Sequence, residues 1–107
     1  SQEVDRMKTD EANFLKPILS TQFKATRKRL NLSQLEMSER LHISVRSYAD
    51  LERGISLCSA PVLLRYILCC ELTPLDLFEL LALVGDAFEG QNTPEAPEGA
   101  PPTQEDA

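Results

Sequence analysis

Two helix-start signals that lie close together along the chain constrain its fold more than any other feature. In the segment "LSQLEMSERLHISVRSYADLERG", residues 32–54, Ser33 and Glu36 form a capping-box pattern at the start of one helix. Ser44 is a good N-cap for the next helix, and Gly54 is a good stop for it. The short stretch between them leaves room only for a tight turn. The two predicted helices span about residues 34–41 and 45–53.

Another helix precedes this pair. Leu19, Phe23 and Leu30 recur at the spacing of one helical face. Pro17 suits the first turn of such a helix, and Asn31 suits its end because Asn tolerates the left-handed backbone conformation that often follows a helix. The sequence therefore predicts a first helix that starts near Pro17 and ends at Asn31.

Two more helices follow the pair. The Ser-Ala-Pro stretch at residues 59–61 opens a fourth helix, predicted over residues 62–70. Thr73 caps a fifth helix, which is apolar nearly all round and which Gly85 should stop. No segment alternates apolar and polar residues as a half-buried strand would. We therefore expect an all-α fold, a compact domain of five helices within residues 14–85.

The two ends of the chain have a different composition from the middle. Residues 1–13 are polar and lack apolar periodicity, so we expect a flexible N-terminal arm. Residues 86–107 are rich in Pro, Glu, Gly and Ala and poor in large apolar groups. Such a segment cannot bury enough surface to offset the entropy of ordering it, so we expect a disordered acidic tail.

The distribution of charge matters more than its sum. The net charge is −6, which alone would argue against a polyanionic partner. Residues 14–83, however, hold nine Lys and Arg against seven Asp and Glu, whereas both ends are acidic. A partner of the folded middle meets a mildly basic surface, so the composition leaves nucleic acid open.

Few residues of the kind that carry chemistry are present. With His42 as the single histidine, no nucleophile and base pair can be assembled, and we expect no enzyme. Three cysteines without a C-x-x-C pair argue against both a disulfide framework and a zinc site. We expect no catalytic residue, metal or cofactor, and reduced, mostly buried cysteines as in a cytoplasmic protein. The apolar run "VLLRYILCC" is interrupted by Arg65 and is too short to span a membrane.

The segment 32–54 resembles the helix-turn-helix of the phage lambda repressor and Cro family. The resemblance continues upstream in "FKATRKRLNLSQ" and downstream in "VLLRYILCCELTPLDLFELL", and it covers roughly residues 18–82. The Ser-Gln pair, the Glu-Arg-Gly end of the third helix and the spacing between them carry it. The resemblance implies a repressor-like transcriptional regulator that binds double-stranded DNA as a homodimer, with its third helix (residues 45–53) in the major groove.

The resemblance also assigns roles to individual positions. The positions that face DNA bases in the family correspond to Val45, Arg46, Ala49 and Asp50. The positions assigned to backbone phosphates are Gln34 and Arg53, and the basic residues beside that edge are Lys24 and Lys28. The internal ion pair that ties the first helix to the third corresponds to Arg27 and Glu52.

Each of these roles has a plainer alternative. Gln34 could be an ordinary surface residue, and Arg53 could merely complement the helix dipole. The lysines and the outer face of the third helix could be solvated surface. Asp50 could accept a hydrogen bond from a cytosine amine, or it could repel phosphates.

Three positions depart from the family pattern. His42 stands in the turn where Gly is frequent, and we expect it in the left-handed conformation. Ser38 replaces the usual Ala of the second helix and is small enough for close packing. Tyr48 replaces an aliphatic residue of the third helix, and we expect it in the core with a partner for its hydroxyl.

The sequence leaves open which kind of macromolecule the protein binds. Some apolar residues of the fifth helix exceed what a small core can bury, and they offer a homodimer surface: Leu77, Leu80, Leu81, Val84 and Phe88. A protein-interaction adaptor on the same fold is the alternative, favoured by the acidic ends and by Asp50. No membrane contact and no small-molecule ligand are expected.

Overall fold

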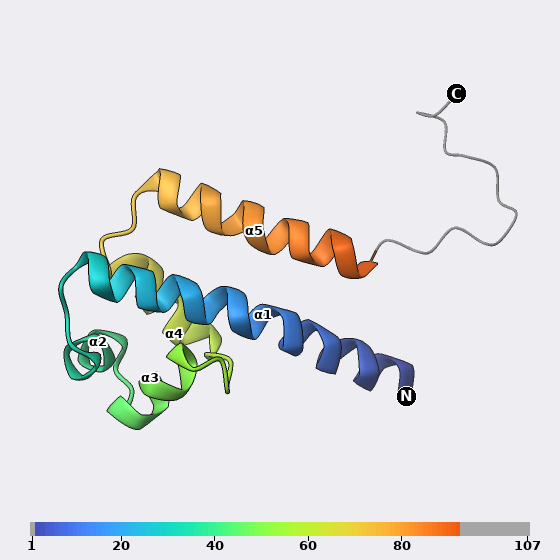
Figure 1. Cartoon of the computed structure of the whole chain (residues 1–107), viewed down its shortest axis with the longest axis horizontal. Coiled ribbons are helices and arrows are strands. Elements are labelled where there is room, and N and C mark those ends of the chain that lie inside the picture. The colour runs from blue at the N-terminus through green and yellow to red at the C-terminus, as the bar shows by residue number, and fades with distance from the viewer. Residues whose placement is uncertain (1, 93–107) are drawn as a thin grey trace, which may run out of the picture.

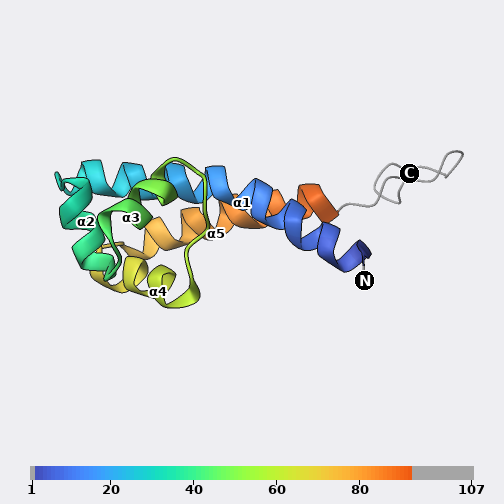
Figure 2. The same ribbon diagram turned by 90° about the horizontal axis from the view of Figure 1, so that it is seen from below.

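The computed structural model describes residues 2–92 of the chain, with the side chains of residues 11–90. Its helices are α1 (Gln2–Arg29), α2 (Gln34–Leu41), α3 (Val45–Glu52), α4 (Ala60–Cys69) and α5 (Pro74–Asn92). No strand occurs in residues 2–92. Figures 1 and 2 show α1 and α5 as two long helices that run side by side, with α2, α3 and α4 gathered at one end of the pair. The expected all-α fold with five helices is confirmed.

Aromatic side chains lie at the centre of the core. The ring centroid of Phe23 on α1 is 4.7 Å from that of Tyr66 on α4 and 6.3 Å from that of Tyr48 on α3. The hydroxyl oxygens of Thr26 and Tyr66 share a buried hydrogen bond of 2.7 Å. The other buried hydrophobic residues are Met37, Leu41, Leu51, Val62, Cys70 and Leu80. This packing fixes the inner face of α3 against α1.

Local hydrogen bonds define where α2, α3 and α5 begin. The backbone N–H of Glu36 donates to the Ser33 hydroxyl at 3.0 Å, and the Ser33 N–H donates back to the Glu36 carboxylate at 2.9 Å. Thr73 and Asp76 form the same reciprocal pair at the start of α5, at 2.9 and 3.1 Å. The Ser44 hydroxyl accepts a backbone N–H of α3 at 3.0 Å. The predicted N-terminal caps are confirmed.

Residues in the left-handed conformation define where helices end. Asn31 after α1 has φ 57°, His42 after α2 has φ 60°, and Gly54 after α3 has φ 72°. All three residue types tolerate this conformation better than most. The predicted helix ends at Asn31 and Gly54 and the expected left-handed conformation of His42 are therefore confirmed.

The N-terminal helix is longer than the sequence predicted. α1 starts at Gln2, whereas we expected a loose arm up to residue 13 and a helix start near Pro17. That start is wrong, because Pro17 lies inside the helix despite removing one backbone hydrogen bond. The extension packs on α5, where the ring of Phe14 meets that of Phe88 edge to face. This tertiary contact outweighs the local signal from the proline.

The C-terminal helix is also longer than predicted. α5 continues through Gly85 to Asn92, so the predicted end at Gly85 is wrong. Gly85 does not adopt a positive φ there, and Phe88 beyond it is held against α1. Part of the expected tail is thus helical, and residues 93–107 lie outside the described residues. The division of the chain into an arm, a domain and a tail stays a prediction.

The three cysteines differ in exposure. All are free, with Cys70 buried and Cys58 half-buried, whereas Cys69 at the end of α4 is exposed. The expectation of mostly buried cysteines is therefore wrong for Cys69. Among residues 2–92 no helix is long and apolar enough to cross a membrane. The same part of the chain contains no cluster of side chains that could hold a metal ion.

Candidate nucleic-acid interface

The turn between α2 and α3 sets the angle between the two helices. The backbone N–H of His42 donates to the carbonyl of Glu39 at 3.2 Å, and that of Ile43 donates to the carbonyl of Ser38 at 3.1 Å. These bonds satisfy the last carbonyls of α2 while the left-handed His42 reverses the chain. Ser38 is 1% exposed, and its hydroxyl donates to the carbonyl of Leu35 at 2.7 Å. The small side chain thus sits inside the domain with its hydroxyl bonded, as its position predicted.

Helix α3 has one buried face and one open face. Tyr48 and Leu51 point into the core and are at most 5% exposed. On the other side Arg46 is exposed, Val45 is 43% exposed, and Ala49 is half-buried. The open face therefore combines small or branched side chains with one long cation. Because the buried face is fixed by the core, this open surface keeps a constant orientation.

Asp50 and Arg53 interact with each other on α3. The Arg53 guanidinium lies 3.1 Å from the Asp50 carboxylate and also donates to the carbonyl of Ala49 at 3.4 Å. The Arg53 side chain is 61% exposed and that of Asp50 is 32% exposed. The structure thus joins an expected base-facing residue to an expected phosphate-contacting residue. The pair is open to solvent and weak, and it reduces the charge that Asp50 presents.

Arg27 and Glu52 form a nearly buried ion pair between α1 and α3. The guanidinium donates through Nε to Oε2 at 2.5 Å and through Nη2 to Oε1 at 3.1 Å. A third donation, from Nη1 to the carbonyl of Leu32, is 3.0 Å long. The Arg27 and Glu52 side chains are 16% and 5% exposed. The pair that the resemblance implies is present as a two-pronged contact.

The Glu52 carboxylate has two further partners. The Tyr48 hydroxyl donates to Oε2, and the side-chain amide of Gln34 donates to Oε1 at 3.1 Å. Burial raises the pKa of Glu52, but the hydrogen bonds from Arg27, Tyr48 and Gln34 outweigh it and leave the pKa below its ordinary value. Burial and the bond to Glu52 both raise the pKa of the Tyr48 hydroxyl, which stays protonated. Sequence patterns did not reveal the link between Gln34 and Glu52.

The basic residues of α1 lie beside this network. Lys24 and Lys28 are exposed. They line an open hollow of about 380 Å³ together with Ser20, Thr21, Ala25 and Glu52. Both lysines therefore lie on the side of α1 that borders the end of α3. Lys24 and Lys28, which we expected beside the DNA backbone, thus lie on the same surface as Glu52 of the ion pair.

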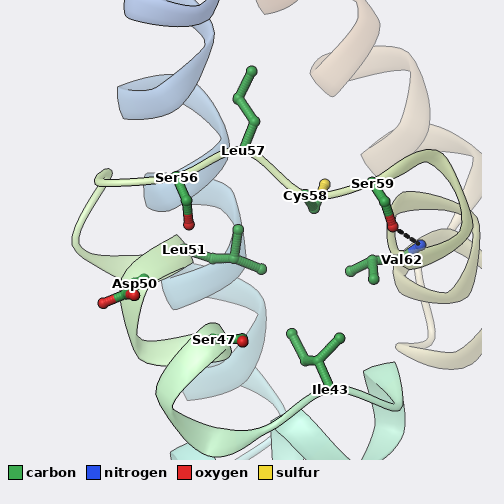
Figure 3. A pocket seen from close by; sticks show the side chains of 9 residues that line it. All are labelled: Ile43, Ser47, Asp50, Leu51, Ser56, Leu57, Cys58, Ser59 and Val62. Atoms are coloured by element: carbon green, nitrogen blue, oxygen red, sulfur yellow. Dashed lines mark hydrogen bonds between the residues drawn. The ribbon is translucent and has the colours of Figure 1, made fainter.

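A second hollow lies on the other side of α3. It has a volume of about 390 Å³, and its lining residues are Ile43, Ser47, Asp50, Leu51, Ser56, Leu57, Cys58, Ser59 and Val62. In Figure 3 the side chains of Ile43, Leu51 and Val62 converge in it. Burial raises the pKa of the Cys58 thiol, so this thiol is a poor nucleophile. Sequence reasoning missed the loop that forms the hollow because the loop has no periodicity.

A comparison with known protein families finds one family that matches the chain. A family model described as helix-turn-helix, of the lambda repressor and Cro type, matches residues 23–77. No curated protein and no solved structure matches the chain. The chain is a member of this helix-turn-helix family. The family consists of DNA-binding transcription regulators and is not enzymatic.

The matched segment locates the helix-turn-helix site within the fold. It begins in α1 and ends in α5, so it contains every residue to which we assigned a DNA contact and both residues of the internal ion pair. It omits Phe14 on α1 and Phe88 on α5, whose rings contact each other. The contact between Phe14 and Phe88 therefore lies outside the matched helix-turn-helix segment.

Proposed function

We propose that this helix-turn-helix protein binds double-stranded DNA in a sequence-specific way and regulates transcription, with α3 in the major groove. The observation that supports this most is the open face of α3. Val45 and Ala49 are small enough to approach base edges, and Arg46 beside them is exposed. Tyr48 and Leu51 hold the helix from behind. A rigid helix with such a face suits direct contact with bases.

The base contacts follow from side-chain chemistry. Arg46 offers two parallel donors that match the O6 and N7 acceptors of guanine. Val45 and Ala49 offer apolar contact to a thymine methyl group. Asp50 is bound to Arg53 in the free protein. Asp50 can accept from a cytosine only if that pair opens, so Arg46 is the main source of specificity in this proposal.

Residues placed to contact the DNA phosphates surround the open face of α3. Gln34 is the first residue of α2, where free backbone N–H groups and the helix dipole favour an anion. Arg53 is the C-cap of α3, and Lys24 and Lys28 lie on α1 next to the α3 end. These residues supply the sequence-independent part of the binding free energy, which weakens as salt rises.

We further propose that the protein acts as a homodimer in the cytoplasm. A groove of about 360 Å³ between α1, α4 and α5 is lined by apolar side chains, among them Leu77, Leu81, Val84 and Phe88. Leu81 at this groove and Phe78 nearby on α5 are 70% and 71% exposed. Such a surface is typical of a protein contact. Leu80, which we had placed in the dimer surface, is 6% exposed and belongs to the core.

Besides the acidic ends of the chain, the position of Asp50 favours the adaptor alternative. Asp50 places a carboxylate on the face that would meet a polyanion. A salt titration separates the two functions, because an adaptor would show only weak binding to any duplex.

Selection of binding sites from a random duplex pool tests the proposal. We expect one preferred sequence, which the protein binds on the order of 10³-fold more tightly than a scrambled duplex at physiological salt. A pool without enrichment, together with equal affinities for all duplexes, would contradict sequence-specific binding and favour the adaptor.

A further inference from the structure

We propose that Glu52 is a positioning residue for a DNA phosphate contact made by Gln34. The proposal rests on the DNA-binding function proposed above and adds a residue to its mechanism. Glu52 does not touch DNA in this account. It acts by holding the Gln34 side-chain amide in one orientation at the start of α2.

The Glu52 carboxylate is saturated with donors. Oε1 accepts from Arg27 Nη2 and from Gln34 Nε2, both at 3.1 Å. Oε2 accepts from Arg27 Nε at 2.5 Å and from the Tyr48 hydroxyl. An ionised carboxylate has about four lone-pair sites, so each is used. A carboxylate held by Arg27 and by the buried Tyr48 is a rigid acceptor for the side-chain amide of Gln34.

The chemistry of the pair decides which way the amide points. A carboxylate only accepts hydrogen bonds, so the –NH₂ group of Gln34 and not its carbonyl must face Glu52. One N–H of this group is used by Glu52, and the second is left for another acceptor. The capping box uses the backbone N–H groups of Ser33 and Glu36, so those of Gln34 and Leu35 are the ones left at this end of the helix. The second N–H of Gln34 can therefore join them around one phosphate.

Two features keep the negative charge of Glu52 from opposing that phosphate. The Arg27 guanidinium is bound to both oxygens of the carboxylate. Lys24 and Lys28 lie on the same hollow as Glu52 and add positive charge there. The carboxylate can thus orient Gln34 without repelling the DNA backbone. Because the side chain is ordered before binding, less conformational entropy is lost when the contact forms.

A double-mutant cycle tests the proposal. We would measure the affinity of the wild type, Gln34→Ala, Glu52→Gln and the double variant for a scrambled duplex at matched salt, below the melting temperature of every variant. Glu36→Gln is the control, because it removes one charge at the same end of α2 without touching Gln34. We expect Gln34→Ala and Glu52→Gln each to weaken binding about tenfold, the size of one hydrogen bond to a charged group. The double variant should be no weaker than Gln34→Ala.

The results separate the possible failures. If Glu52→Gln changes affinity by the same factor with and without Gln34→Ala, or by no more than the Glu36→Gln control, Glu52 is structural and the positioning proposal is overturned. If the wild type binds no duplex, the proposed DNA-binding function fails and takes the positioning role with it.

A measurement on the free wild-type protein covers the case in which Glu52→Gln does not fold. NMR relaxation of the Gln34 side-chain –NH₂ group reports how rigid it is. We expect an order parameter near that of rigid backbone, about 0.85, whereas a value below about 0.6 would overturn the proposal.

Discussion

The rings of Phe14 and Phe88 meet edge to face, with centroids 5.0 Å apart and an angle of 89° between their planes. Phe14 belongs to the N-terminal half of α1, and Phe88 lies near the end of α5. Neither residue is in the segment that the helix-turn-helix family model matches. The contact therefore joins two helix extensions that the domain type itself does not account for, and each extension stabilises the other.

A double-mutant cycle on this pair measures their coupling. Phe14→Leu and Phe88→Leu each keep an apolar side chain but remove the ring contact. We expect a coupling free energy of about 0.5–1.5 kcal/mol, the usual range for an edge-to-face pair. This coupling free energy is obtained from urea unfolding of the wild type, both single variants and the double variant. Strictly additive effects would show that the two extensions are independent.

The parts of the fold that the sequence predicted correctly depend on local chemistry. The capping boxes at Ser33 and Thr73 need only residues three positions apart. The left-handed positions at Asn31 and His42 need only residue types that tolerate them. Because these signals act within one turn of helix, no knowledge of the tertiary structure is needed to find them.

The errors have the opposite origin. Pro17 and Gly85 are local stop signals, but packing between α1 and α5 overrides both. The bond from Gln34 to Glu52 joins residues far apart along the chain, so neither periodicity nor capping rules could predict it. The dimer surface was overestimated at Leu80 because the apolar pattern of α5 does not show which residues meet the core.

Replacing Glu52 by Ala tests the role of the ion pair in stability. The change leaves Arg27 nearly buried without its carboxylate and removes acceptors from Tyr48 and Gln34. We expect a loss of about 3 kcal/mol in the free energy of unfolding. Asp50→Asn on the same helix is the control and should cost less than about 1 kcal/mol, because its ion pair is solvent-exposed. If thermal unfolding gives a similar loss of stability for both substitutions, the buried ion pair of Glu52 contributes no more to stability than the exposed pair of Asp50.

The depressed pKa of Glu52 predicts an acid-sensitive domain. The folded state holds the ionised carboxylate more strongly than the unfolded state does, so the contribution to stability is present above the ordinary pKa of 4.5 that applies in the unfolded chain. It is lost as the pH falls through the lower pKa of the folded state. The lowered pKa values of Glu36 and Asp76 act in the same direction.

Urea unfolding at pH 7 and at about pH 3 measures this loss. Glu52→Gln should lose less stability between the two pH values than the wild type, because the contribution of Glu52 is absent while those of Glu36 and Asp76 remain. An identical loss in both proteins would contradict a stabilising ionised Glu52.

The proposed dimer surface can be disrupted at Leu81. This side chain is 70% exposed, so Leu81→Asp should leave the fold intact while placing a charge at the apolar groove. We expect the wild type to sediment as a dimer and the variant as a monomer in analytical ultracentrifugation. Leu35→Asp is the control, because Leu35 is 56% exposed but lies on α2. A variant that stays dimeric would place the contact elsewhere, and a monomeric wild type would remove the dimer from the account.

In the proposed complex Arg46 contacts a base, whereas Gln34 contacts the DNA backbone. The deciding measurement compares the wild type, Arg46→Ala and Gln34→Ala on one selected and one scrambled duplex at matched salt. Gln34→Ala should weaken binding to both duplexes about equally. Arg46→Ala should cost roughly 1–3 kcal/mol on the selected duplex and relax the preference at one base pair, with a smaller effect on the scrambled duplex. If Arg46→Ala binds both duplexes as tightly as the wild type does, α3 does not contact bases through Arg46, and the proposed mode of DNA recognition is contradicted.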